Sequence, residues 1–206
     1  MPDRAGVVIA GGYSTRFGEA DKALADVDGE PMLARIVGRL ARAVDAVTVN
    51  CRPDQREAFA SAVGSHEVGV PVGFTVDADP DRGPLAGVGT ALGAVEATHA
   101  AVVGCDMPGL DPDFLAFLFR KVRSHDAAVP ELRSGHRQPL QAVYRVDAMR
   151  AAAERRLAAG NRSLRGALDE LNVAVVGPET ITELGAWRSL RDVNTRAELA
   201  SFLNGA

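Results

Sequence analysis

The sequence predicts an α/β fold in which helices cover both faces of a mostly parallel sheet. Short apolar runs alternate with helix-like segments through the first half of the chain, as in parallel strands joined by crossover helices. Of the 206 residues, 47% are hydrophobic but only 5% are aromatic, so we expect a core of Ala, Val and Leu side chains. The length suits a single domain spanning residues 1–206.

The first half opens with a buried strand at residues 6–10, which runs into a glycine-rich loop. Met32, Ile36 and Leu40 then repeat at helical spacing behind Pro31, a residue favoured in the first turn of helices. Residues 100–104 form the most continuous apolar run of the chain. In order, we expect helices at 31–43, 53–63 and 85–97 to alternate with strands at 44–49, 73–76 and 100–104.

In the second half, two expected strands flank a polar loop at residues 133–139. No repeat or low-complexity linker separates this half from the first. We expect strands at 127–129, 140–144 and 173–176, and helices at 112–123, 147–158, 163–171 and 196–203.

Charge and composition exclude several classes of protein. Lys and Arg total 23 against 27 Asp and Glu, a net charge of −4, which argues against a general nucleic-acid or anionic-membrane binder. Cys51 and Cys105 have no zinc-site spacing, so we expect two reduced thiols. Neither a signal peptide nor an apolar stretch of membrane-spanning length is visible, and we therefore expect a cytosolic protein.

The loop after the first strand is the first candidate site. It runs Ala10-Gly-Gly-Tyr-Ser-Thr-Arg-Phe-Gly18 and is followed by Asp21-Lys22. Glycines after a strand allow backbone N–H groups to approach a phosphate, and Arg16 and Lys22 add cationic groups. Lys22 is one of only two lysines in an arginine-rich chain, which favours a specific role. The alternative is a tight strand-to-helix turn with a solvated charge pair.

Asp106 is the second candidate, because it directly follows the apolar strand at 100–104. Ligands of parallel sheets collect at the carboxyl ends of the strands. A carboxylate there suits Mg²⁺, which takes one or two carboxylates together with waters and substrate phosphates. Asp106 could instead cap the next helix, but Asp111 is better placed for that.

The third candidate is the acidic loop from Asp77 to Gly87. Its carboxylates could accept hydrogen bonds from a nucleobase or ribose, and the helix that follows Gly83-Pro84 could face a phosphate. Asp79 and Asp81 are better explained as turn residues. The four histidines are scattered, and no covalent-hydrolase motif is present.

These groups suffice for nucleotidyl transfer, in which a phosphate monoester attacks the α-phosphorus of a nucleoside triphosphate. The attacking phosphate is already anionic near neutral pH, because its second pKa is about 6. The enzyme must supply positioning, cations and hydrogen-bond donors. We expect Lys22, Arg16 and Asp106 with Mg²⁺ to supply them.

Together these motifs resemble those of the molybdenum cofactor guanylyltransferases. The first loop is similar to that family's L-A-G-G-x-S-x-R-M-G-x-D-K signature, and the resemblance covers essentially the whole chain in the right order. The other matching pieces are Gly83-Pro-Leu-Ala-Gly87, Cys105-Asp-Met-Pro108, Gln138-Pro-Leu-Gln-Ala-Val-Tyr144, Ser163-Leu-Arg165 and Asp192-Val-Asn-Thr195.

The resemblance implies a Rossmann-like nucleotidyltransferase fold and transfer of GMP from GTP to molybdopterin-bound molybdenum, with Mg²⁺. It also implies other cofactor-biosynthesis proteins or molybdoenzymes as protein partners. We assign about residues 1–110 to the nucleotide and 111–206 to the acceptor. By position, the resemblance implies GTP contacts from Ile9, Ala10, Gly11, Gly12, Lys22, Asn50, Asp77 and Asp106, with Mg²⁺ held by Asp106. It implies acceptor contacts from Arg137, Gln138, Pro139, Leu140, Ser163 and Arg165.

The chain departs from the family pattern in three places: Glu19-Ala20 lengthens the first loop, Phe17 replaces Met, and Arg196-Ala197 stands where Pro-Glu is commoner. The nearest rival function is cytidylyl transfer to the same cofactor; such enzymes tend to carry A-A-G, so Gly11 favours guanine. Guanylyl transfer to another phosphomonoester is a further alternative. The missing G-x-G-x-x-G argues against an NAD-type oxidoreductase. A non-catalytic nucleotide-binding protein would need neither Lys22 nor Asp106.

Overall fold

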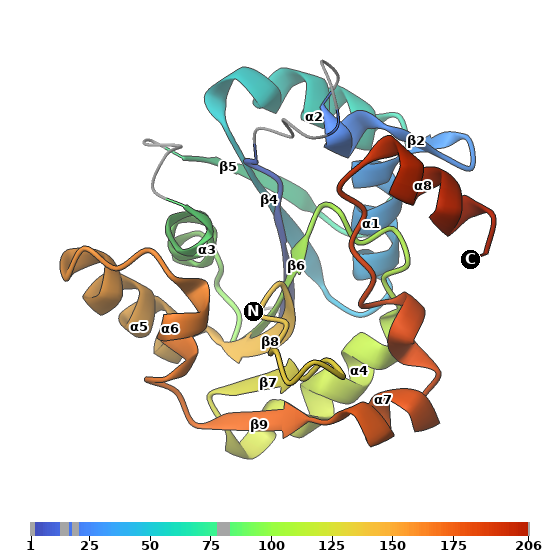
Figure 1. Cartoon of the computed structure of the whole chain (residues 1–206). Coiled ribbons are helices and arrows are strands. Elements are labelled where there is room, and N and C mark those ends of the chain that lie inside the picture. The colour runs from blue at the N-terminus through green and yellow to red at the C-terminus, as the bar shows by residue number, and fades with distance from the viewer. Residues whose placement is uncertain (1–2, 13–16, 18–20, 78–82, 206) are drawn as a thin grey trace.

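The computed structural model describes residues 3–12, 17, 21–77 and 83–205, and it confirms a single α/β domain (Figure 1). Within these residues a seven-stranded sheet has the order β5-β4-β1-β6-β8-β7-β9. Its strands are β1 (Arg4–Ile9), β4 (Ala46–Cys51), β5 (Val72–Val76), β6 (His99–Gly104), β7 (Ala127–Pro130), β8 (Gln141–Arg145) and β9 (Val173–Val176).

The sheet is mostly parallel, as predicted. Strand β1 pairs in parallel with both β4 and β6, and β5 continues this set beyond β4. Only β8 runs against its neighbours β6 and β7. It is reversed because β7 and β8 are joined by a short connection, whereas two parallel strands need a long crossover.

Helices cover both faces. They are α1 (Met32–Ala41), α2 (Arg56–Gly64), α3 (Pro84–Gly93), α4 (Pro112–Lys121), α5 (Val146–Ala158), α6 (Leu164–Leu168), α7 (Pro178–Glu183) and α8 (Arg196–Leu203). In Figure 1, α3, α5 and α6 lie on one side of the sheet and α1 and α8 on the other. Helix α3 ends at Gly93 rather than at the predicted 97, and α6 is shorter than the predicted 163–171.

Alternation along the strands builds a core on each face. Ala5 and Val7 of β1 belong to the buried cluster under α3, α5 and α6, whereas Val8 belongs to the cluster under α1, α2 and α4. Strand β6 alternates in the same way. The central strands are therefore buried on both faces, which explains why their sequences read as continuous apolar runs.

The elements that were not predicted include a short hairpin and a short helix. Strands β2 (Asp26–Val27) and β3 (Glu30–Pro31) form a hairpin whose turn is Asp28-Gly29, with φ values of 57° and 89°. Asp-Gly is a standard signal for such a turn, but two-residue strands show no alternation. Helix α7 follows Gly177 with Pro178 in its first turn.

The loop after β6 is held by helix α1 and by the C-terminal segment. Arg35 Nε donates to the Pro108 carbonyl at 3.2 Å, and Arg39 Nη1 donates to the Leu110 carbonyl at 3.0 Å. Between these two points, a Cβ on Gly109 would overlap the backbone carbonyl of Arg188. Gly109, which follows Asp106 in the same loop, therefore allows the loop backbone to approach the backbone of Arg188 closely.

We expect Gly109→Ala to lower the free energy of unfolding by about 1–3 kcal/mol, because the overlapping atoms belong to backbone and must shift together. Urea unfolding followed by circular dichroism measures the change. The matched control is Gly38→Ala within α1, where an added Cβ meets nothing within 4 Å. That control should be neutral or stabilising, and equal effects in the two variants would contradict the close contact at Gly109.

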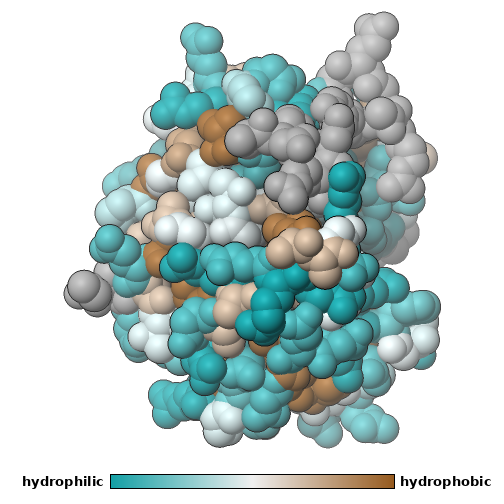
Figure 2. All heavy atoms as spheres, turned by 90° about the vertical axis from the view of Figure 1, so that its left-hand side faces the viewer, coloured by the Kyte–Doolittle hydropathy of each residue, from teal (hydrophilic) through white to brown (hydrophobic). Residues whose placement is uncertain are grey.

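No described helix is long and apolar enough to cross a membrane. Figure 2 shows the face that carries α3, α5 and α6. It is mostly hydrophilic, and its hydrophobic residues form separate small groups. This pattern is ordinary for a surface exposed to water.

Candidate functional site

The carboxyl ends of β1, β4, β5 and β6 lie at one edge of the sheet, because these four strands are parallel. Gly11 and Gly12 follow β1, Asn50 lies at the end of β4, Asp77 follows β5 and Asp106 follows β6. Apart from Lys22, which lies in a short helix, the predicted nucleotide residues within the described chain are thus brought together by the strand ends. Arg16, Asp79 and Asp81 lie outside the described residues.

Lys22 and Asp106 form the centre of this edge. Lys22 Nζ lies 3.0 Å from Asp106 Oδ2, and the side chains are 12% and 24% exposed. Asp21 caps the short helix η1 (Lys22–Leu24) by accepting from the Ala23 N–H, which orients Lys22. As expected from the sequence, the ammonium and the carboxylate meet at the rim. Asp111, not Asp106, caps α4.

Asn194 completes this centre, and sequence reasoning did not single it out. Lys22 Nζ also donates to Asn194 Oδ1 at 3.1 Å. The segment is fixed because the Val193 N–H donates to the Asp106 carbonyl at 2.8 Å and the Asn194 N–H donates to Glu198 Oε2 at 2.7 Å. The sequence signal for Asn194 is its place in Asp192-Val-Asn-Thr195, a segment that resembles the family pattern but to which the sequence analysis assigns no role.

The oxygens around Lys22 Nζ suit a divalent ion that shares its ligands with a substrate. Asp106 Oδ2 and Asn194 Oδ1 both lie within 3.1 Å of one cationic nitrogen. Among the described residues there is no cluster of three or more His, Cys, Asp or Glu side chains that could hold a metal alone. Magnesium commonly takes one or two carboxylates and completes its shell with waters and phosphates, so this donor set fits it.

A second group of polar side chains lies beside the glycine loop. Asn50 is fully buried, and its Nδ2 donates to Asp77 Oδ1 at 3.0 Å and to the Thr75 hydroxyl at 3.3 Å. Asn50 Oδ1 has no hydrogen-bond partner within the described chain. It lies against Gly87, where an added Cβ would be 2.7 Å away. A buried acceptor without a partner costs stability, which is typical of a group kept for a ligand.

The first residues of the loop are tied into the sheet. The Ala10 N–H donates to the Asn50 carbonyl at 2.8 Å, and the Cys105 N–H donates to the Ile9 carbonyl at 3.1 Å. Ile9 and Ala10 thus hold the loop in register, while Gly12 is exposed. A Cβ on Gly11 would lie 3.2 Å from Asp77 Oδ2, so the Asp77 carboxylate rests against Gly11.

The predicted acceptor residues fall into two places. Arg137, Gln138, Pro139 and Leu140 belong to the β7–β8 connection, which returns to the strand ends because the Gly104 N–H donates to the Leu140 carbonyl at 3.3 Å. This brings the connection beside the strand end that carries Asp106.

Ser163 and Arg165 lie at the start of α6. The Ser163 hydroxyl caps this helix by accepting from the Gly166 N–H at 3.1 Å, and Arg165 is exposed. A Cβ on Gly83 would lie 3.6 Å from Arg162 Cβ, so this segment borders the start of α3.

The two thiols are poor nucleophiles. Burial, with the Asp106 carboxylate nearby, raises the pKa of the Cys105 thiol to about 12, and burial raises the pKa of Cys51 to about 11. Both therefore stay protonated near neutral pH, and only a thiolate attacks efficiently. Both are free, in line with the sequence expectation.

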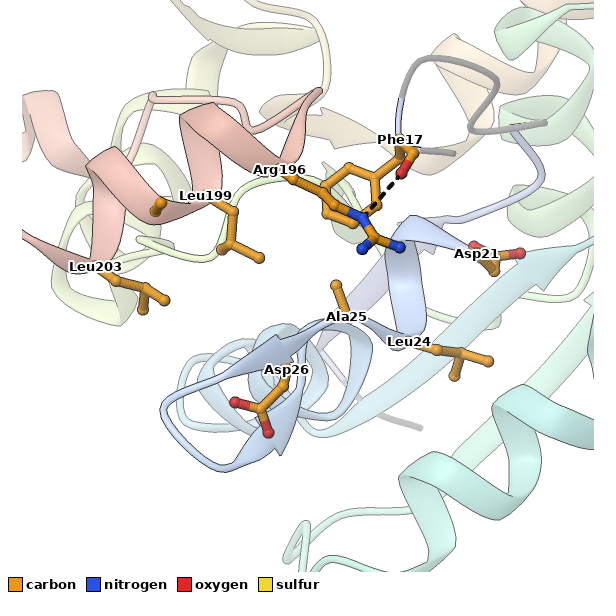
Figure 3. Close-up of a pocket in the computed structure, with 9 residues that line it drawn as sticks. Phe17, Asp21, Leu24, Ala25, Asp26, Arg196, Leu199 and Leu203 are labelled. Carbon is orange, nitrogen blue, oxygen red and sulfur yellow. Dashed lines mark hydrogen bonds between the residues drawn. The ribbon is translucent and has the colours of Figure 1, made fainter. Parts of the chain in front are cut away.

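An apolar cleft of about 580 Å³ lies outside the nucleotide residues, between α8 and the segment of η1 and β2 (Figure 3). Leu199 of α8 and Ala25 of the opposite wall point into it. At one end Arg196 Nε donates to the Phe17 carbonyl at 3.3 Å, and the Phe17 side chain is buried. Arg196, a departure from the family pattern, thus contacts the backbone of Phe17, which follows the glycine-rich turn after β1.

Several known proteins are similar to this chain over most of its length. The family model described as the MobA-like NTP transferase domain matches residues 6–174. A protein of Natronomonas pharaonis named probable molybdenum cofactor guanylyltransferase is 44% identical over 199 residues, which cover 97% of this chain and 96% of that protein. A protein of the same name from Haloferax mediterranei is 36% identical, with 97% and 92% covered.

Among solved structures, molybdopterin-guanine dinucleotide biosynthesis protein A of Archaeoglobus fulgidus superposes with a TM-score of 0.79 at 23% identity, covering 97% of each chain. The 4-diphosphocytidyl-2C-methyl-D-erythritol synthase of Anaerococcus prevotii superposes with a TM-score of 0.74 at 10% identity, covering 98% of this chain and 97% of that one. These two likenesses show the fold.

Proposed function

The chain belongs to the family of MobA-like NTP transferases, and we propose that it transfers GMP from GTP to molybdopterin-bound molybdenum and releases pyrophosphate. The observation that carries the proposal is the meeting of Lys22 Nζ with Asp106 Oδ2 at 3.0 Å, beside the glycine loop. The product is the guanine dinucleotide form of the cofactor. The reaction takes place in the cytoplasm.

The chemistry is a displacement at phosphorus. An oxygen of the acceptor's terminal phosphate forms a bond to the α-phosphorus of GTP, and the bond from that phosphorus to the bridging oxygen of the β-phosphate breaks. Pyrophosphate leaves with the electron pair. The attacking phosphate is anionic near neutral pH, so no side chain needs to remove a proton from it.

Different site residues bind the phosphates, the metal ion and the acceptor. The glycine-loop amides and Lys22 donate to the phosphate oxygens, so Lys22 leaves its contacts with Asp106 and Asn194 when GTP binds. Asp106, with Asn194 Oδ1 beside it, would hold Mg²⁺, which would supply positive charge to neutralise the phosphate oxygens. Residues of the β7–β8 connection and of α6 face the acceptor, which makes 1–110 the nucleotide half and 111–206 the acceptor half.

Asn50 and Asp77 recognise the guanosine part of GTP. The unpartnered Asn50 Oδ1 and the Asp77 carboxylate are acceptors, and guanine presents two N–H donors on one edge. The second candidate is cytidylyl transfer to the same cofactor. Gly11 favours guanine because a methyl group there would press on the Asp77 carboxylate, only 3.2 Å away.

The test offers equal concentrations of GTP, CTP and ATP to the protein with magnesium and molybdopterin-bound molybdate, and identifies the product by mass. We expect the guanine product in large excess, with pyrophosphate released in equal amount. Omitting magnesium and adding a chelator is the control and should stop the reaction. A cytosine product would establish the second candidate, and tight GTP binding without any product would indicate a non-catalytic nucleotide-binding protein.

A further inference from the structure

Two buried side chains that follow β4 contact the glycine loop from its protein side. Arg52 Nη1 donates to the carbonyls of Gly12 at 2.8 Å and Gly11 at 3.3 Å, and the Arg52 side chain is 10% exposed. Gln55, 4% exposed, accepts from the Arg52 backbone N–H at 3.0 Å and directs its Nε2 at the Gly12 carbonyl, 3.5 Å away. Neither Arg52 nor Gln55 belongs to the residues assigned above to substrate.

The bonds to these carbonyls determine where the loop amides point. In a trans peptide the C=O and the N–H lie on opposite sides, and the described chain has no cis peptide bond. Because the Gly11 carbonyl points at Arg52, the N–H of Gly12 in the same peptide unit points away from Arg52. Gly12 is exposed, so this N–H is open to an anion.

Gln55 also fixes the helix that carries Lys22. Gln55 Nε2 donates to Asp21 Oδ2 at 2.5 Å, and the other carboxylate oxygen of Asp21 accepts from the Ala23 N–H at 3.0 Å. One amide side chain thus contacts both the glycine loop and the cap of η1. The loop amides and the Lys22 ammonium, which come from different elements, share one support.

The charge of Arg52 is balanced by Asp54, which lies outside the glycine loop. Arg52 Nε and Nη2 bind the two oxygens of Asp54 at 3.1 and 3.0 Å, and the Asp54 side chain is 68% exposed. This bidentate pair leaves Nη1 for the carbonyls and fixes the plane of the guanidinium. The arginine therefore acts as an oriented donor in the loop's support, pointing away from the phosphate side.

We propose that Arg52 and Gln55 are positioning residues that hold the glycine loop and Lys22 in the geometry that binds a triphosphate. They act through the loop carbonyls and Asp21 and touch no substrate atom. The inference rests on the proposed function only for the identity of the triphosphate, because the same geometry serves any polyphosphate.

The experiment compares Arg52→Met and Gln55→Met, which keep an unbranched apolar stem and remove the donors, with Arg56→Met as the matched control. Arg56 is exposed in the first turn of α2, so its variant loses the same charge without touching the loop in the described structure. Calorimetric titration with inorganic tripolyphosphate and with GTP, both with magnesium, gives the dissociation constants. Thermal unfolding with and without ligand gives the stability of each variant.

We expect the dissociation constants of both ligands to rise at least tenfold in Arg52→Met and several-fold in Gln55→Met, and to change less than twofold in Arg56→Met. The thermal midpoint without ligand should change little in Gln55→Met, while the ligand-induced rise in midpoint shrinks. A merely structural role would lower the midpoint and leave the affinity of the folded protein unchanged. Arg52→Lys should recover part of the affinity, because one ammonium can reach one carbonyl.

Unchanged affinity in a folded Arg52→Met variant would overturn the inference. If that variant does not fold, unchanged affinity in Gln55→Met overturns it equally. If the unmodified protein transfers no GMP but the variants lose affinity for tripolyphosphate, the inference is supported and the proposed function is refuted. Full GMP transfer by the unmodified protein, together with unchanged affinities in the variants, would support the proposed function and refute the inference.

Discussion

Asp106→Ala is expected to lower turnover with GTP and magnesium by about a thousandfold or more, to the limit of detection. Removing a single preorganised charge-stabilising group in an active site typically costs about a hundredfold to a thousandfold, and here the loss would include the proposed metal ligand. A continuous assay for released pyrophosphate measures the effect. The fold should persist, because the Asp106 side chain lies at the rim and its partners Lys22 and Asn194 are only partly buried.

The matched control for this prediction is Asp113→Ala. Asp113 is an exposed carboxylate in the first turn of α4, seven positions after Asp106, so its variant loses the same charge without touching the site. Its pyrophosphate release should stay within a factor of two. Undiminished pyrophosphate release by a folded Asp106→Ala protein would show that Asp106 takes no part in the reaction. It would also contradict the catalytic role proposed for this edge of the sheet.

Lys22→Ala is expected to lower kcat/KM for GTP by roughly 10- to 150-fold. A hydrogen bond to a charged group contributes about 1.5–3 kcal/mol, and each 1.36 kcal/mol is a factor of about ten in rate. Lys22→Arg should recover little, because a planar guanidinium does not replace the compact ammonium that we propose to bind the triphosphate. Steady-state kinetics with varied GTP measures both variants.

The chain provides its own control, since Lys121 is the one other lysine in the sequence. It lies at the end of α4, where its Nζ is 5.1 Å from the centre of the Phe117 ring. Lys121→Ala should leave kcat/KM for GTP unchanged within a factor of two. Equal kinetics for Lys22→Ala and the unmodified protein would show that the ammonium does not contact the triphosphate.

Most of the fold could be predicted because its elements carry strong local patterns. Residues 100–104 read as a buried strand since both faces of β6 are covered, and the predicted helix 196–203 matches α8 because a capping box of Thr195 and Glu198 begins it. The hairpin of β2 and β3 could not be found by alternation, since each strand has two residues.

The site was predicted as far as its residues follow strands. Asp106 could be placed because it follows a strand that ends at the ligand-binding edge of the sheet, and Lys22 because it follows the first loop, whereas Asn50 was named from the family resemblance alone. Asn194 and Arg52 could not be placed. Asn194 reaches Lys22 across 172 positions of sequence, and Arg52 acts through backbone carbonyls, so neither contact leaves a local pattern.

The contact between Lys22 and Asn194 has a consequence for the order of folding. Closing a loop of 172 positions carries a large entropic cost, which is offset only after the intervening sheet has formed. The central strands can therefore condense first, and the contact between Lys22 and Asn194 is among the last to form. A chain still being synthesised would hold most of its core before it could engage a nucleotide.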